Sequence, residues 1–128
     1  MTDSKYLNIL RTEDVAINLL AINASPRVSR ISNSQILLDY AKEAAGAMPA
    51  VTISEFSFAK KEIAPCRMCI SYCSKHQECV SKDDFQEFRS LWLKADAVIW
   101  SVPIYHMGPP SIVRAALDRM NELRFQTS

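Results

Sequence analysis

The stretch that decides the fold is VAINLLAI, residues 15–22. It is apolar except for Asn18, and a continuous apolar run of this length is typical of a strand buried on both faces of a sheet. Two further segments, at 51–56 (VTISEF) and 97–102 (AVIWSV), have the same character. The sequence therefore predicts three strands.

Between and after these strands, apolar residues recur with helical spacing. The predicted helices run from Ser34 to about Gly46, from Phe85 to Ala95, and from about Ser111 onward. Strands that alternate with helices predict an α/β fold, in which helices cover both faces of a parallel sheet. We expect a doubly wound sheet in three layers, α/β/α.

Composition excludes several function classes. The chain has 128 residues, of which 48% are hydrophobic and 23% charged, as in a single globular domain. A net charge of +1 gives no electrostatic reason to expect nucleic acid or an acidic membrane as partner. Two glycines are too few for a Gly-x-Gly-x-x-Gly dinucleotide loop. Without a long apolar run or a secretory signal pattern, we expect a cytoplasmic protein, whose cysteines bind metal or react rather than form disulfides.

The loop after the first strand, residues 23–33, is rich in hydroxyl and amide groups and holds Arg27 and Arg30. It opens a helix, and a helix N-terminus offers unpaired N–H groups that suit a phosphate. Ligands of open α/β sheets bind at such strand ends. The alternative is that Ser32, Asn33 and Ser34 only cap the helix, while the arginines are solvated.

Within this loop, ASPR at 24–27 followed by NS at 33–34 resembles the phosphate loop of the NADPH-dependent FMN reductase and iron-sulfur flavoprotein families. Asn23 and Ala24 stand where those families usually have a glycine, and the loop is longer here. The resemblance implies a flavodoxin-like fold that binds flavin mononucleotide (FMN). The residues it assigns to the phosphate are Ser25, Arg27, Asn33, Ser34 and, by position, Gln35, and we add Ser32 from the same loop as a candidate.

A second loop carries the same resemblance. SVPIYHM at 101–107 is similar to the loop that holds the flavin ring in these families, and PSIVRAALDR at 110–119 is similar to the segment that follows. The resemblance assigns Pro103, Ile104, Tyr105 and His106 to the ring. Asp118 and Arg119 are interpreted as structural.

All four cysteines fall in one segment, CRMCISYCSKHQEC at 66–79. Cys66, Cys69, Cys73 and Cys79 suit a [4Fe–4S] cluster or a zinc ion, but free or redox-active thiols fit the spacing as well. The segment is similar to the compact cysteine motif of iron-sulfur flavoproteins, with three residues rather than the usual two between the second and third cysteines. His76 is an alternative ligand.

The function that the resemblance implies is transfer of electrons from NAD(P)H through FMN to a flavin, a quinone or an iron-sulfur acceptor. FMN supplies the chemistry, so no catalytic side chain is required. The rival hypotheses are a non-catalytic flavin or iron-sulfur electron carrier and a metal-stabilised interaction domain without flavin.

The expected domain plan is an N-terminal arm at 1–14 and a flavodoxin-like domain at 15–128, with a cysteine-rich insert at 64–81. A flavodoxin-like sheet has five strands in the order 2-1-3-4-5, and strands 4 and 5 have no counterpart. The outer edge of the third strand, with Val98 and Trp100 exposed beside it, would favour association. We therefore expect a fragment or a homo-oligomer; the alternative is that residues 1–14 fold back to cover this edge.

Overall fold

The structure, a computed structural model, describes residues 15–28 and 32–125. Its sheet has three parallel strands in the order β2-β1-β3. The strands are β1 (Ile17–Asn23), β2 (Val51–Ser57) and β3 (Ala97–Ser101). This order is the 2-1-3 part of the flavodoxin-like sheet, so the predicted fold class is confirmed. The predicted arm at 1–14 lies outside the described residues, as do Ser29 and Arg30.

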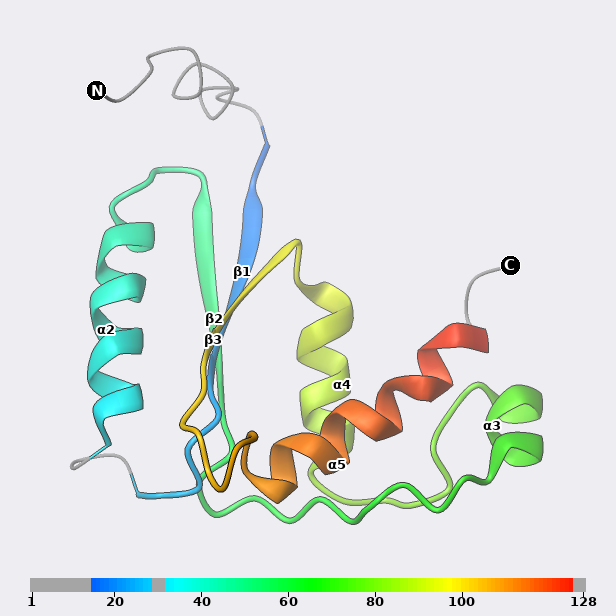
Figure 1. Cartoon of the computed structure of the whole chain (residues 1–128). Helices are drawn as coiled ribbons and strands as arrows, with labels where there is room; N and C mark the ends of the chain where they lie inside the picture. Colours follow the sequence, from blue (N-terminus) through cyan, green and yellow to red (C-terminus); the bar gives the residue numbers. More distant parts are fainter. Residues whose placement is uncertain (1–14, 29–31, 126–128) are drawn as a thin grey trace.

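Helices cover both faces of the sheet. They are α2 (Asn33–Gly46), α3 (Ile70–His76), α4 (Phe85–Lys94), α5 (Ser111–Arg119) and the 3-10 helix η2 (Met120–Phe125). In Figure 1, α2 lies on one side of the sheet and α4 and α5 on the other, which gives the three expected layers. None of the described helices is long and apolar enough to cross a membrane.

The larger part of the core lies between the sheet and the α4–α5 layer. Leu20 and Ile22 of β1 are fully buried there. Leu19 and Ala21 alternate to the opposite face, which α2 covers. Because β1 is the middle strand and is buried on both faces, its sequence is apolar from Leu19 to Ile22, and the buried residue that follows, Asn23, needs hydrogen-bond partners.

Aromatic rings fill the space between β2, β3 and α4. Phe88 of α4 is fully buried and lies 5.3 Å from the ring of Phe56 and 5.9 Å from that of Trp100. The expectation that Val98 and Trp100 are exposed is wrong, because both are partly buried against this cluster. Their side chains point to the face that α4 covers, so only the backbone edge of β3 remains without a neighbouring strand in the described part of the chain.

Two features near the cysteines were not predicted. The first is α3, a two-turn helix inside the cysteine-rich insert. The second is the change to a 3-10 helix at Met120, within the helix predicted from Ser111 onward, where η2 continues directly from α5 and packs against α3. The insert is thus held against the C-terminal end of the α5–η2 segment, at the far right in Figure 1.

Candidate functional site

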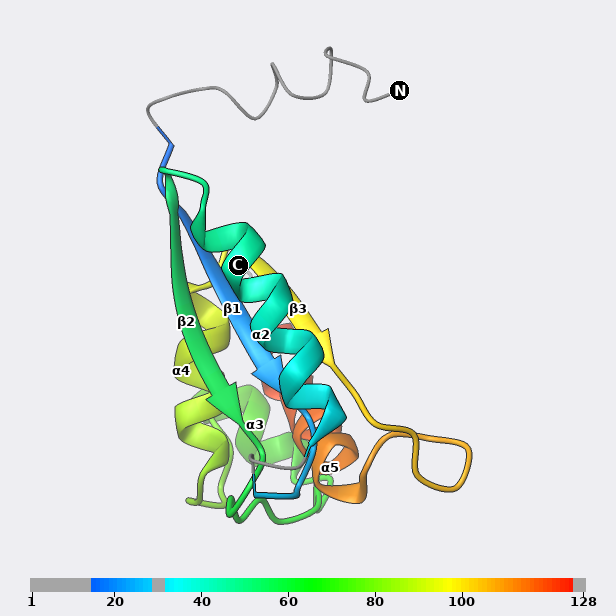
Figure 2. The same cartoon turned by 90° about the vertical axis from the view of Figure 1, so that its left-hand side faces the viewer.

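The two loops predicted to bind flavin leave the sheet side by side. Asn23, the last residue of β1, pairs with Ser101, the last residue of β3. The Ala24 N–H then donates to the Ser101 carbonyl over 2.9 Å, so the pairing extends one residue into the loop. Figure 2 shows both strands ending at the same edge of the sheet. This edge is where open α/β sheets bind ligands.

Asn23 organises the first loop, and sequence reasoning treated it only as a departure from a glycine. Its side chain is 1% exposed. Its Oδ1 accepts the N–H of Ser25 over 3.0 Å, and its Nδ2 donates to Oε1 of Gln35 in α2 over 2.7 Å. An asparagine side chain that accepts the backbone N–H two residues further on is a common turn device, and this is the signal that could have revealed the role of Asn23.

Gln35 is engaged in this framework. Its Oε1 accepts from Asn23, and its Nε2 donates to Asp39 over 2.8 Å. The hydrogen bond from Gln35 contributes most to holding the pKa of Asp39 below its ordinary value, and Lys42 adds to it. The side chain therefore ties α2 to the end of β1.

The hydroxyl groups of the first loop lie at the start of α2. Ser25, Ser32 and Ser34 are all buried, at 2%, 4% and 9% exposure, whereas Arg27 is exposed. Ser32 is the N-cap of α2, yet within the described residues its side chain makes no capping hydrogen bond. The side chain of Ser32 therefore does not act as a cap, although its carbonyl accepts the N–H groups of Gln35 and Ile36. A phosphate at this helix start would meet the N–H groups of Asn33 and Ser34.

The second loop makes a tight turn at 105–108. The Tyr105 N–H donates to the Gly108 carbonyl over 2.7 Å, and the Gly108 N–H donates back over 3.0 Å. His106 and Met107 between them have φ values of 42° and 68°. Such left-handed conformations are costly for side chains other than glycine and cluster at ligand-binding segments.

This turn presents apolar side chains to solvent. Ile104 is 72% exposed and Met107 96% exposed. Tyr105 also lines a cavity of about 570 Å³, together with Pro109 and, from the cysteine-rich insert, Pro65. A flat apolar ring next to a phosphate group would find both kinds of surface at this edge, so the residues present fit FMN.

The four cysteines lie around α3. Cys69 is its N-cap, Cys73 lies within it, and Cys66 and Cys79 flank it; all four are partly buried free thiols. Burial raises the pKa of the Cys73 thiol, and the nearby charges of Cys79 and Glu122 add to this effect. The thiols therefore lie close enough to influence one another electrostatically.

No group of three or more His, Cys, Asp or Glu side chains within the described residues is arranged to hold one metal ion. A zinc ion needs four ligands about 2.0–2.3 Å from one point. A [4Fe–4S] cluster binds each cysteine to a different iron, so its ligands are spaced more widely. The donor set of four thiols has the composition of a cluster site, with the carboxylate of Glu122 close enough to act on Cys73. His76 instead stacks on Tyr72, with ring centroids 4.1 Å apart.

Arg119 joins the cysteine segment to α5, a role that sequence reasoning missed. It is 2% exposed, and its Nε donates to Sγ of Cys79 over 3.3 Å. Its remaining N–H groups donate to the Asp83 carboxylate over 2.6 and 2.8 Å and to the carbonyls of Ala64 and Ser81. The interpretation of Arg119 as structural left out its contact with a cysteine.

Asp83 is the anionic centre of the same region. Besides Arg119, it accepts the N–H groups of Ala64 and Phe85 over 2.8 and 3.0 Å. Burial acts to raise the pKa of this carboxyl, but the hydrogen bonds from Arg119, Ala64 and Phe85 outweigh it and hold the pKa below its ordinary value. Asp83 therefore remains a carboxylate at neutral pH.

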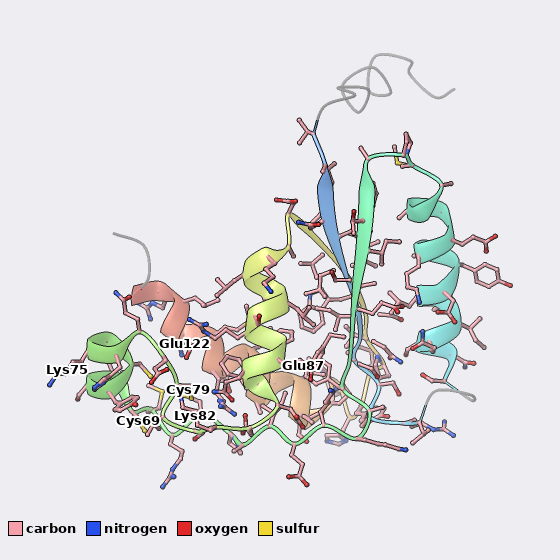
Figure 3. All side chains as sticks on the ribbon, turned by 180° about the vertical axis from the view of Figure 1, so that it is seen from behind. Cys69, Lys75, Cys79, Lys82, Glu87 and Glu122 are labelled. Carbon is pink, nitrogen blue, oxygen red and sulfur yellow. The ribbon has the colours of Figure 1, made fainter. Side chains whose placement is uncertain are left out.

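A second buried carboxylate, Glu122 of η2, lies nearby. It is 1% exposed and pairs through Oε1 with Nε of Arg89 in α4, while its Oε2 has no partner among the described residues. Figure 3 shows Glu122, Cys79 and Cys69 at the same end of the molecule. Charged side chains from α4, α5 and η2 thus surround the cysteine segment on its inner side.

This fold and these two loops define the class of FMN-binding flavodoxin-like proteins. A family profile for NADPH-dependent FMN reductases matches residues 17–127, and the chain belongs to that family.

Among curated proteins, two iron-sulfur flavoproteins of Archaeoglobus fulgidus are similar to this chain. One is 35% identical over 68 residues, which is 53% of this chain and 34% of that protein. The other is 30% identical over 102 residues, which is 79% of this chain and 44% of that protein. An iron-sulfur flavoprotein of Methanocaldococcus jannaschii is 30% identical over 105 residues, 80% of this chain and 50% of that protein. The chain thus spans half or less of the length of these relatives.

Proposed function

We propose that this chain forms the FMN-binding part of a flavin-dependent oxidoreductase. The observation that carries the proposal is the pairing of Asn23 with Ser101, which delivers two ligand-type loops to one edge of the sheet. The N-terminus of α2 and Arg27 would hold the phosphate, and the 103–106 segment would hold the ring. FMN supplies hydride and electron transfer when bound, and the protein supplies position and electrostatics.

The electron donor in this proposal is NAD(P)H, which the family name supports. The experiment is anaerobic mixing of the FMN-loaded chain with NADPH or NADH, followed by the flavin absorbance. Bleaching by a nicotinamide cofactor supports the proposal. The acceptor, a free flavin, a quinone or an iron-sulfur protein, is then identified by which of them restores the absorbance.

A second proposal concerns the cysteines: Cys66, Cys69, Cys73 and Cys79 would hold a [4Fe–4S] cluster. It is supported by the donor set and by the names of the similar archaeal proteins. Anaerobically prepared protein should then contain four irons and four sulfides per chain, as this cluster type requires. Cys73→Ser should abolish the broad visible absorption. Retention of full iron by this variant would place Cys73 outside the site.

The cysteine segment also favours a second candidate function, a non-catalytic electron carrier. A carrier would exchange electrons with protein partners but would not react with NAD(P)H. In the experiment above, dithionite would then bleach the flavin whereas NADPH and NADH would not. That outcome would replace the reductase proposal by the carrier.

We also propose that the protein works as a homo-oligomer. The edge of β3 has no neighbouring strand in the described part of the chain. Ile36, Leu37 and Tyr40 of α2 are 50–69% exposed. Unpaired strand edges and apolar patches favour association. Size-exclusion chromatography with light scattering should give a mass above that of one chain, and a monomeric mass would contradict the proposal.

A further inference from the structure

Arg119 is a buried cation with a fixed position. All three guanidinium nitrogens donate hydrogen bonds: Nε to Cys79, Nη1 to Asp83 and Nη2 to the Ser81 carbonyl. The Cζ atom lies 4.5 Å from the centroid of the Phe85 ring. Because the guanidinium is planar and its donors have fixed directions, an arginine that is already held by some of them loses little freedom when it donates a further hydrogen bond. The Nε–H that points at Cys79 is therefore preorganised.

The acceptors of Arg119 lie on both sides of the cysteine segment. The Ala64 carbonyl precedes Cys66 by two residues, and the Ser81 carbonyl follows Cys79 by two residues. One side chain on α5 thus gathers the beginning and the end of the segment. The pair with Asp83 fixes the guanidinium from the opposite side, over 2.6 Å.

The contact with Cys79 differs from the other contacts of Arg119, because its acceptor is the sulfur of a proposed cluster ligand. A hydrogen bond to a ligand sulfur of an iron-sulfur cluster, and a nearby positive charge, both favour the more negative, reduced form. In a buried region the effective dielectric constant is low, so such a charge acts more strongly than it would in water. The hydrogen bond from Arg119 to Cys79 should therefore affect the reduction potential of a bound cluster, which can be measured.

We propose that Arg119 is a positioning residue that closes the cysteine segment on α5 and raises the reduction potential of the bound cluster through its hydrogen bond to Cys79. This inference rests on the cluster proposed above. The couple is a one-electron reduction: the cluster gains one electron from a one-electron reductant, dithionite in the titration, and no bond or proton is exchanged. Arg119 itself is unchanged.

The test is a redox titration of the holoprotein with wild type, R119Q, R119K and D83N. R119Q removes the cation and its Nε donor, and should lower the reduction equilibrium constant at least tenfold, which for one electron is about 59 mV. R119K keeps the charge but loses the Nε donor, so its potential should lie between those of wild type and R119Q. D83N removes an anion, while the asparagine amide oxygen and the carbonyls of Ala64 and Ser81 still accept from Arg119 and keep it beside Cys79, so the potential should not fall.

Arg114 provides the matched control. It lies on the same helix, is 69% exposed and pairs with Asp118 four residues on. R114Q removes the same charge from α5 without touching a cysteine. Its potential should equal that of wild type.

Several outcomes would overturn the inference. A purely structural anchor predicts that R119Q and D83N lose iron in parallel, while R119K keeps the wild-type potential. Equal potentials of R119Q and R114Q would likewise contradict a role for the Cys79 contact. If R119Q retains no cluster, the other two variants test the inference: it requires a potential below that of wild type in R119K and no fall in D83N, and any other result contradicts it. A wild-type protein without iron and sulfide would refute the cluster proposal itself, and this result is read before any variant is made.

Discussion

Asn23 offers the sharpest test of how the first loop is held. Asn23→Ala would remove the acceptor of the buried Ser25 N–H and the donor to Gln35. Leaving a buried donor unpaired costs about 1–3 kcal/mol, and loss of an ordinary hydrogen bond costs about 0.5–1.5 kcal/mol. The free energy of unfolding should therefore fall by about 2–4 kcal/mol.

Asn18→Ala is the matched control, since Asn18 lies on the same strand with an exposed side chain. It should change the free energy of unfolding by less than about 0.5 kcal/mol. Urea unfolding followed by tryptophan fluorescence measures the free energy of unfolding of both variants, because Trp92 and Trp100 pack, partly buried, against the core. In FMN titrations, N23A should bind at least about tenfold more weakly than N18A, since about 1.4 kcal/mol of lost loop order corresponds to a factor of ten.

A double-mutant cycle isolates the hydrogen bond itself. The N23A and Q35A substitutions should show a coupling energy of about 0.5–1.5 kcal/mol, as expected for residues in direct contact. Additive effects, or an N23A variant as stable as N18A, would refute the argument that Asn23 holds the loop through these bonds.

Three further predictions concern the phosphate contact, the acid stability and the core. Arg27→Ala should weaken FMN binding about ten- to a hundredfold, the value of a charge-assisted hydrogen bond of about 1.5–3 kcal/mol, and leave riboflavin binding unchanged; equal losses for both ligands would move Arg27 away from the phosphate. The pKa of Asp83 lies below its ordinary value of 3.8, so its contribution to stability is present above that pH and is lost as the pH falls through the lower folded value. D83N should therefore flatten the fall in unfolding free energy below pH 4, and parallel curves for the two proteins would contradict this. Phe88→Ala should cost about 3–5 kcal/mol because its ring is fully buried, whereas L93A, half exposed on the same helix, should cost under about 1 kcal/mol; similar losses in the two variants would show that the aromatic cluster contributes little.

The strands and the two loops could be predicted because their signals are local. The run at 15–22 is apolar wherever β1 is buried, and polar residues begin at Asn23, where the strand ends. The helix at 33–46 follows from the spacing of its own side chains. In each case neighbouring residues alone determine the structure, and the sequence order then fixes which loops share an edge.

The surroundings of the cysteines could not be predicted in this way. The contact between Arg119 and Cys79 joins residues 40 positions apart, and it depends on how α5 packs against the insert. The helix α3 has seven residues and none that is buried, so it lacks the apolar periodicity by which helices are recognised. The burial of Trp100 likewise depends on α4, a separate element of the chain.

Binding of FMN to the purified chain, followed by quenching of flavin fluorescence and by the visible spectrum, tests the proposed flavin site most directly. We expect a yellow complex with one FMN per chain, tighter binding of FMN than of riboflavin, and loss of that preference in the R27A variant. A colourless protein that leaves the fluorescence of added FMN unchanged would contradict a flavin site in this chain.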